Sequence, residues 1–214
     1  MAAKWGVIVI DIQGDFTEWK KGSLAVPGSD EAYVRNAEAA TRRLKKAGLL
    51  IFGTQDWHPP DHVSFASSHP GKRPFDTVEI RGRTHVLWPP HCVQGTENAR
   101  ILIDNNLFLA VVKKAQNPAL ESYSAFQDEG GIKTEMENIL RINGVEKLVI
   151  YGIATDYCVR ATALDGLAAG YPVTVVEDLC RGVSPDSTAC ALVEMRGKGV
   201  RLVNTLDEIL HEIN

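Results

Sequence analysis

The stretch "KLVIYGIATDYCVRATALDGLAAGYPVTVV", residues 147–176, decides the fold class. It opens with an apolar, β-branched run at 147–152, continues with a helical pattern at 156–169, and closes with a second apolar run at 172–176. Gly170 stands where the helix should stop, since glycine readily adopts the left-handed conformation that ends helices. A strand, a helix and a strand in this order predict two parallel strands joined by a right-handed crossover.

The same alternation continues along the rest of the 214-residue chain. Further apolar runs stand at 6–10, 49–53, 107–113 and 200–203, further helical patterns at 30–47, 131–142 and 185–198, and helix-ending glycines at 48, 144 and 199. Short apolar runs that alternate with helices are typical of a parallel sheet buried on both faces. We therefore expect one α/β domain over residues 1–214, with a three-layer, mostly parallel, six-stranded, Rossmann-like sheet and helices on both faces.

One long segment, at about 54–106, does not follow this pattern. It is rich in His, Pro, Gly and Trp and shows little periodicity beyond a possible helical turn near Ala99. Loops of this length in a compact domain are usually functional or disordered, and the many aromatic residues argue against disorder. We interpret the segment as a functional insertion in the single domain.

Composition excludes several classes of protein. The 23 basic and 27 acidic residues give a net charge of −4 and form no basic patch, which argues against a nucleic-acid partner. No apolar stretch approaches the roughly 18 residues needed to cross a bilayer, so we expect a soluble cytoplasmic protein without a membrane partner. Four widely spaced cysteines fit neither a disulfide scaffold nor a Cys-x-x-Cys zinc site, so we expect reduced thiols. They are Cys92, Cys158, Cys180 and Cys190.

Polar residues follow four of the predicted strands. Asp11 follows the first strand, Asp56 and His58 follow the second, Lys114 follows the third, and Cys158 opens the helix after the fourth. Ligands of open α/β sheets bind outside the carboxyl ends of the strands. We therefore expect these side chains to converge at one edge of the sheet.

Cys158, Asp11 and Lys114 have the chemistry of a nucleophile, a base and an orienting charge. A thiol in the first turn of a helix lies where the helix dipole favours its ionised form, and Thr155 is a candidate N-cap for that helix. Strand alternation sends Lys113 and Lys114 to opposite faces, so only one of them can reach the cleft. The alternatives are an inert, buried Cys158, an Asp11 that caps a turn, and a solvated Lys114.

The insertion offers a carboxylate and several imidazoles. They are Asp56, His58, His62, His69 and His91. Such a set suits Zn²⁺, Fe²⁺ or Mn²⁺, and three protein ligands with open positions mark a catalytic metal site. We interpret His69, near a Pro-Gly turn, as polar surface, and the role of Cys92, which stands beside His91, stays open.

In four motifs the chain resembles the nicotinamidases (pyrazinamidases) of the isochorismatase-like cysteine hydrolases, over essentially its whole length. The motifs are "DIQGDF" at 11–16, "DWHPPDHVSF" at 56–65 with "WPPHCVQGT" at 88–96, "KKAQNPALESYSAF" at 113–126 and "GIATDYCV" at 152–159. The resemblance implies an isochorismatase-like fold and the hydrolysis of nicotinamide, and also of pyrazinamide, through a cysteine thioester. The products from nicotinamide would be nicotinate and ammonia, in NAD salvage.

The resemblance also implies roles for individual residues. It implies a catalytic triad of Asp11, Lys114 and Cys158, with an oxyanion hole formed by the N–H groups of Ala154 and Cys158 after a cis peptide bond at Ile153–Ala154. It implies one divalent metal ion, zinc in the first place and iron or manganese as alternatives, held by Asp56, His58, His91 and, as a fourth ligand, His62. The substrate-binding residues it implies are Phe16, Trp88, Tyr123, Ile153 and Tyr157.

One residue departs from the family pattern, and two other functions stay open. The family lysine is typically followed by glycine, whereas Lys114 is followed by Ala115. The first alternative function is a hydrolase of the same fold that acts on isochorismate, a ureido acid or N-carbamoylsarcosine, although the Asp-x-His motif argues against it. The second is a non-catalytic metal-binding protein, and a homo-oligomer is compatible with each of these functions.

Overall fold

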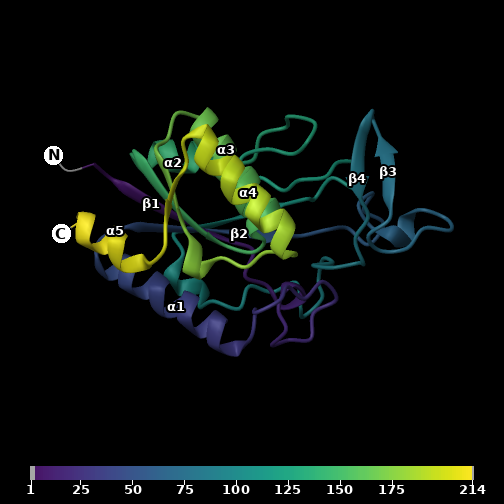
Figure 1. Cartoon of the computed structure of the whole chain (residues 1–214), viewed down its shortest axis with the longest axis horizontal. Coiled ribbons are helices and arrows are strands. Elements are labelled where there is room, and N and C mark those ends of the chain that lie inside the picture. Colours follow the sequence, from purple (N-terminus) through teal and green to yellow (C-terminus); the bar gives the residue numbers. More distant parts are fainter. Residues whose placement is uncertain (1–2, 214) are drawn as a thin grey trace.

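The computed structural model describes residues 3–213, and its centre is a parallel sheet (Figure 1). Six strands lie in the order β5-β2-β1-β6-β7-β8, and each runs parallel to its neighbours. Their bounds are β1 Trp5–Ile10, β2 Leu50–Asp56, β5 Ala110–Lys114, β6 Lys147–Gly152, β7 Val173–Val176 and β8 Arg201–Val203. The expected six-stranded parallel sheet is confirmed.

Helices cover both faces of the sheet, so the expected three layers are also confirmed. In Figure 1, α1 and α5 lie on one side and α2, α3 and α4 on the other. The helices are α1 Glu31–Lys46, α2 Met136–Ile142, α3 Arg160–Ala168, α4 Pro185–Lys198 and α5 Leu206–Ile213. Asp30 caps α1 by accepting a 2.8 Å hydrogen bond from the Tyr33 N–H, and Gly199, with φ 101°, ends α4.

The insertion contains a hairpin that the sequence did not predict. Strand β3 (Thr77–Ile80) pairs antiparallel with β4 (Arg83–Val86), and the hairpin stands at one end of the molecule in Figure 1. Arg81 and Gly82 connect the strands with positive φ angles of 53° and 76°, as tight hairpin turns require. Each strand has only four residues and no buried face, so the pattern in the sequence is weak.

Several other boundaries differ from the expectation, and among them α3 begins at Arg160 and not at residue 156. Strand β2 continues to Asp56, so Asp56 lies in the strand and not after it. Helix α2 begins at Met136, because residues 131–135 form the end of a loop, and β5 begins at Ala110 after a short helical turn at 105–107. Helix α5 was not expected.

The two central strands, β1 and β6, define a crevice at their carboxyl ends. The chain leaves β1 through α1 toward β2 on one side, and leaves β6 through α3 toward β7 on the other side. Ligands of open α/β sheets bind where the connections diverge in this way. Ile10 pairs with Gly152 at this point, and a Cβ on Gly152 would lie 2.1 Å from the Ile10 carbonyl oxygen, so the close approach requires glycine.

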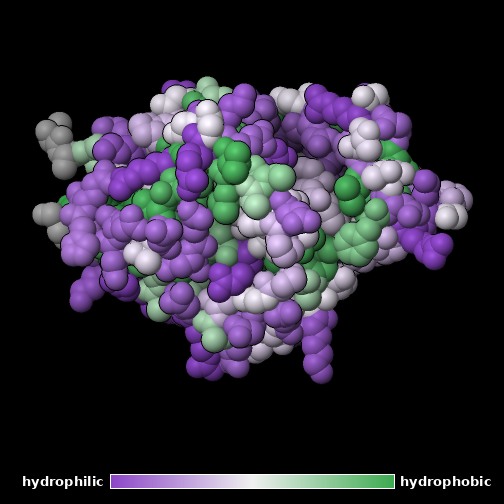
Figure 2. All heavy atoms as spheres, viewed as in Figure 1, coloured by the Kyte–Doolittle hydropathy of each residue, from purple (hydrophilic) through white to green (hydrophobic). Residues whose placement is uncertain are grey.

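The surface has no marked apolar face in the view of Figure 2. Hydrophilic residues cover most of this face, and hydrophobic residues occupy smaller areas between them. Within residues 3–213, no helix combines the length and the apolar character that a membrane span needs.

Candidate active site

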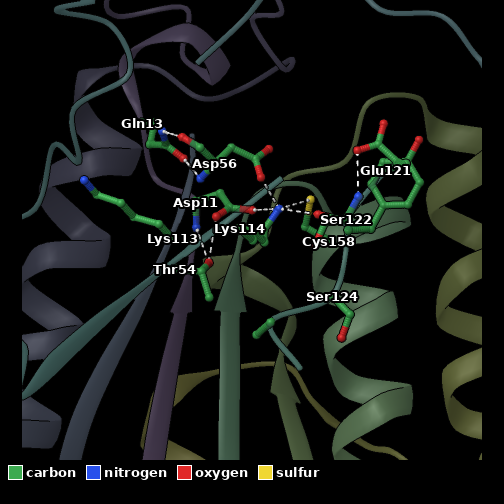
Figure 3. Close-up of polar contacts among 12 residues, drawn as sticks. Asp11, Gln13, Thr54, Asp56, Lys113, Lys114, Glu121, Ser122, Ser124 and Cys158 are labelled. Carbon is green, nitrogen blue, oxygen red and sulfur yellow. Dashed lines mark hydrogen bonds and ion pairs between the residues drawn. The ribbon is translucent and has the colours of Figure 1, made fainter. Parts of the chain in front are cut away.

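The polar residues at the strand ends lie together at the crevice (Figure 3). Asp11 follows β1, Asp56 ends β2, Lys114 ends β5, and Cys158 lies in the turn after β6. All four residues are at least 95% buried. Because neighbouring parallel strands end at one edge, residues that are distant in the sequence form a single cluster.

The Lys114 ammonium is the centre of this cluster. Its Nζ lies 3.0 Å from Asp11 Oδ2 and 3.4 Å from Cys158 Sγ, and it also contacts the Asp56 carboxylate. Burial alone would lower the pKa of Lys114, but attraction to Asp11 and Asp56 outweighs burial and raises the pKa well above its ordinary value. Lys113 points away from the cluster in Figure 3, with its Nζ 4.1 Å from the centre of the Trp57 ring.

Asp11 is a buried carboxylate beside the thiol. Its Oδ1 accepts a 2.7 Å hydrogen bond from the Thr54 hydroxyl. Burial raises the pKa of Asp11 to about 6; Lys114 opposes this increase and Asp56 adds to it. A carboxylate with a pKa in this range can both accept and return a proton near neutral pH.

Cys158 lies in a single helical turn at 155–159 that precedes α3. Burial raises the pKa of its thiol well above the ordinary value; Lys114 opposes this shift, and Asp11 adds to it. Burial and the carboxylates thus oppose the ionised form of the thiol that the helix end favours, whereas Lys114 supports it. The proposed N-cap is wrong, since Thr155 is itself the first residue of the turn and Ala154 occupies the cap position.

The peptide bond between Ile153 and Ala154 is cis, as the resemblance implied. Ala154 and Cys158 both line the cavity next to the thiol. Ile153 is fully buried and does not belong to the residues that line the cavity. Ala154 therefore lines the cavity, whereas Ile153 lies outside its lining.

Asp56, His58 and His91 form a group that could hold a metal ion, with ligand atoms within 4.8 Å of one another. Burial lowers the pKa of both imidazoles, which keeps them in the neutral form that binds metals. His91 Nδ1 lies 2.8 Å from the Pro89 carbonyl oxygen, so it carries the proton and leaves Nε2 free for a ligand. His58 Nδ1 is buried without a hydrogen-bond partner among the described residues. The donor set and this unpaired nitrogen fit a divalent metal.

His62 lies beside this group, but both of its ring nitrogens have other partners. Nδ1 lies 2.7 Å from the Ser64 hydroxyl, and Nε2 lies 3.0 Å from the Leu120 carbonyl oxygen. His62 groups with His58 and Glu121, and not with Asp56 and His91. To bind a metal held by Asp56 and His91, His62 would have to give up one of these hydrogen bonds.

A mostly apolar cavity lies next to Cys158. Its apolar lining consists of Phe16, Leu24, Val26, Trp88, Tyr123, Ala154, Tyr157 and Val183, and its polar lining of Asp56, His91, Glu121 and Cys158. The rings of Trp88 and Tyr157 are nearly perpendicular, with centres 4.9 Å apart, and Trp88 Nε1 donates a 3.2 Å hydrogen bond to the Tyr123 hydroxyl. Aromatic walls with a few convergent polar groups suit a small planar ligand.

Comparisons with known proteins show the family of the chain. Residues 6–207 match the family model described as the isochorismatase domain. The chain belongs to the isochorismatase family. Within this family, it is 39% identical over 209 residues to a nicotinamidase of Escherichia coli, an alignment that covers 94% of this chain and 95% of the relative.

Two solved structures of isochorismatase-family enzymes are similar along nearly the whole chain. Yeast nicotinamidase bound to the inhibitor nicotinaldehyde is 30% identical, with a TM-score of 0.87 and coverage of 94% of this chain and 100% of that chain. The pyrazinamidase of Pyrococcus horikoshii in complex with zinc is 37% identical, with a TM-score of 0.78 and coverage of 94% and 98%. The family resemblance seen in the four motifs is confirmed.

Glu121 is a residue of this isochorismatase-family site that no sequence argument singled out. It lines the cavity, and burial raises the pKa of its carboxyl to about 7. The sequence signal was its place inside the motif "KKAQNPALESYSAF", two residues before Tyr123. Cys92, whose role was open, is fully buried and lies outside the lining of the cavity.

Proposed function

We propose that the chain is a nicotinamidase that hydrolyses nicotinamide to nicotinate and ammonia in NAD salvage, and that also accepts pyrazinamide. One observation carries the proposal: a buried thiol, a carboxylate and an ammonium lie in contact beside an aromatic cavity whose polar lining includes two members of the metal-ligand group. The nicotinamidases of Escherichia coli and yeast support it, with 39% and 30% identity over nearly their full length. The single domain over residues 1–214 would supply every part of the site.

The proposed chemistry begins with a proton transfer. The Asp11 carboxylate takes the proton of the Cys158 thiol, and Lys114, which stays cationic, stabilises the thiolate as it forms. The thiolate attacks the carboxamide carbon and forms a C–S bond. The N–H groups of Ala154 and Cys158 would meet the negative charge on the carbonyl oxygen, a contribution of about 3 kcal/mol per donor.

Asp11 then returns its proton to the nitrogen that leaves as ammonia, when the C–N bond breaks. A water molecule, deprotonated by Asp11, attacks the remaining thioester and releases nicotinate and the Cys158 thiol. The pKa of about 6 at Asp11 supports this double role, since neither protonation state is strongly favoured near neutral pH. Phe16, Trp88, Tyr123 and Tyr157 would hold the pyridine ring between them.

We further propose one divalent metal ion held by Asp56, His58 and His91, with His62 as the fourth ligand. Zinc is the first choice because a carboxylate with imidazoles suits it, and because the Pyrococcus relative was solved with zinc; iron and manganese are the alternatives. When bound, the ion would hold the pyridine nitrogen and so orient the amide over the sulfur. All four cysteines are free thiols in the structure, which supports a reducing, cytoplasmic location.

Ammonia release by the purified protein tests the function directly. Nicotinamide, pyrazinamide and isochorismate are offered in parallel, before and after chelation and after Zn²⁺ or Fe²⁺ is restored. Metal-dependent release from nicotinamide is the expected result. No release from nicotinamide by folded, metal-loaded protein would contradict the proposal and point to another substrate of the family.

A further inference from the structure

Gln13 is fully buried, and its side-chain amide bonds both main-chain polar groups of Asp56, a proposed metal ligand (Figure 3). Its Oε1 accepts a 2.8 Å hydrogen bond from the Asp56 N–H, and its Nε2 donates a 2.9 Å hydrogen bond to the Asp56 carbonyl oxygen. The second Nε2 proton goes to the Ala99 carbonyl oxygen at 2.8 Å. The side chain thus fixes the position and direction of the Asp56 backbone.

Asp15 makes similar contacts next to the second proposed ligand, His91. Its Oδ2 accepts a 2.7 Å hydrogen bond from the Cys92 N–H, and its Oδ1 accepts a 3.4 Å hydrogen bond from the Ser23 N–H. The Ser23 hydroxyl lies 2.7 Å from the Pro90 carbonyl oxygen, so both neighbours of His91 are tethered. Cys92 has φ 46°, a left-handed conformation that a non-glycine residue adopts only when its surroundings enforce it.

Both side chains belong to the loop 11–16, which begins with the proposed base, Asp11. Neither Gln13 nor Asp15 lines the cavity, so neither is placed to touch substrate. Asp56 and His91 come from segments 35 positions apart in the chain, and the loop 11–16 contacts both segments. Metal ligands need such support, because a divalent ion binds tightly only when its ligands are already oriented.

We propose that Gln13 and Asp15 are positioning residues that hold Asp56 and His91 in a metal-binding arrangement. The loop that carries the base then also shapes the metal site. This inference rests on the metal ion of the proposed function. It concerns how the ion is held and not how the amide is cleaved, so metal binding is the property to measure.

The test compares wild-type protein with Gln13→Met, Asp15→Asn and Asp15→Ala. Thr41→Val is the matched control: Thr41 is fully buried and its hydroxyl contacts the Ala37 carbonyl oxygen and the Tyr151 hydroxyl, neither of which belongs to the site. The Zn²⁺ dissociation constant is measured by competition with a chromophoric chelator, and ligand geometry by the absorption spectrum of the Co²⁺-loaded protein. Urea midpoints of the metal-free proteins report folding separately.

We expect Gln13→Met and Asp15→Ala to weaken Zn²⁺ binding by about 10- to 100-fold and to change the Co²⁺ spectrum. Asp15→Asn keeps one oxygen for the Cys92 N–H, so its loss of affinity should be smaller than that of Asp15→Ala. Thr41→Val should lower the urea midpoint and leave Zn²⁺ affinity within about twofold, since it touches no ligand.

The outcomes separate this inference from the proposed function. If wild-type protein binds no metal, both the metal of the proposed function and the positioning role fall. If wild-type protein binds Zn²⁺ and the Gln13 and Asp15 variants bind it equally well, only the positioning role is overturned. If Gln13→Met does not fold, the Asp15 variants provide the test. The positioning role is then overturned if Asp15→Asn and Asp15→Ala both bind Zn²⁺ as tightly as wild-type protein.

Discussion

Lys114 Nζ lies 3.0 Å from Asp11 Oδ2, and both side chains are fully buried. The same ammonium contacts Asp56, so one cation balances two buried carboxylates. Removing one partner of a buried ion pair leaves uncompensated charge, which is far more costly than losing an exposed pair.

We therefore expect Lys114→Met to destabilise the metal-free protein by about 3 kcal/mol or more and to abolish ammonia release. Lys113→Met is the control on the same strand, since its ammonium lies over Trp57 away from the cluster. It should change stability and turnover little. Urea unfolding and nicotinamide hydrolysis measure both; a Lys113 variant that loses activity while the Lys114 variant keeps it would refute the assignment.

Cys158→Ala should abolish turnover and keep the metal, because the sulfur is not part of the group formed by Asp56, His58 and His91. His58→Ala should lose both metal and turnover. Elemental analysis of the purified variants, together with ammonia release, measures the two properties. Near-normal turnover by Cys158→Ala would exclude the covalent mechanism.

The pH dependence of kcat/KM should follow Asp11, whose pKa burial raises to about 6. Below that pH, the carboxyl is protonated and cannot accept the thiol proton, so kcat/KM should fall about tenfold per pH unit. Thr54 donates a hydrogen bond to the ionised form and so lowers the Asp11 pKa. Thr54→Val should therefore move the acid limb to higher pH, and a limb that stays in place or moves to lower pH would contradict the role of Asp11.

Ala115 has φ 55°, a left-handed conformation that glycine adopts without the steric cost of a Cβ. This explains physically why glycine is typical at this position. Ala115→Gly should stabilise the protein by up to about 1 kcal/mol, whereas Ala110→Gly, within β5, should destabilise it by about 0.5–1 kcal/mol. Thermal unfolding of the two variants measures the difference; equal destabilisation by both would show that the left-handed position carries no strain.

Gly152→Ala should strongly destabilise the folded protein, although it adds only one methyl group. The new Cβ would meet the Ile10 carbonyl oxygen at 2.1 Å, and both strands would have to move at the crevice. Gly48→Ala is the control, because Gly48 also has a positive φ, 91°, but a methyl group added there would meet no atom within 4 Å. It should cost only about 1–2 kcal/mol, from its backbone conformation. Comparable urea midpoints for the two variants would contradict the close-approach argument.

Much of this architecture could be predicted from the sequence, because it depends on local patterns. Buried strands are visible in the sequence as apolar runs, and helix ends are visible as glycines. Parallel strands then bring Asp11, Asp56 and Lys114 to one edge of the sheet. Strand alternation separates Lys113 from Lys114 in the same way, because successive side chains point to opposite faces.

Features that depend on tertiary contacts could not be predicted in this way. The raised pKa of the Cys158 thiol results from burial and from carboxylates contributed by other strands, and no local pattern encodes it. The hydrogen bonds that occupy His62 come from Ser64 and from Leu120, which is 58 positions away. Helix α5 is a different case: Leu206, Ile209 and Ile213 have helical spacing, so the sequence does carry its signal.

Asp56 and Lys114 are partners in the register of β2 and β5, and they also form an ion pair. These last residues of two neighbouring strands therefore connect the proposed metal ligands with the cluster that contains Cys158. The two halves of the site therefore share one charge balance. A descendant of this chain that dispensed with the metal by replacing Asp56 would leave Lys114 with Asp11 as its remaining buried carboxylate partner in the cluster. Lys114 and Asp11 would then form a neutral pair, but the pKa of Asp11, which Asp56 helps to raise, would fall, so loss of the metal in this lineage should also change the base beside the thiol.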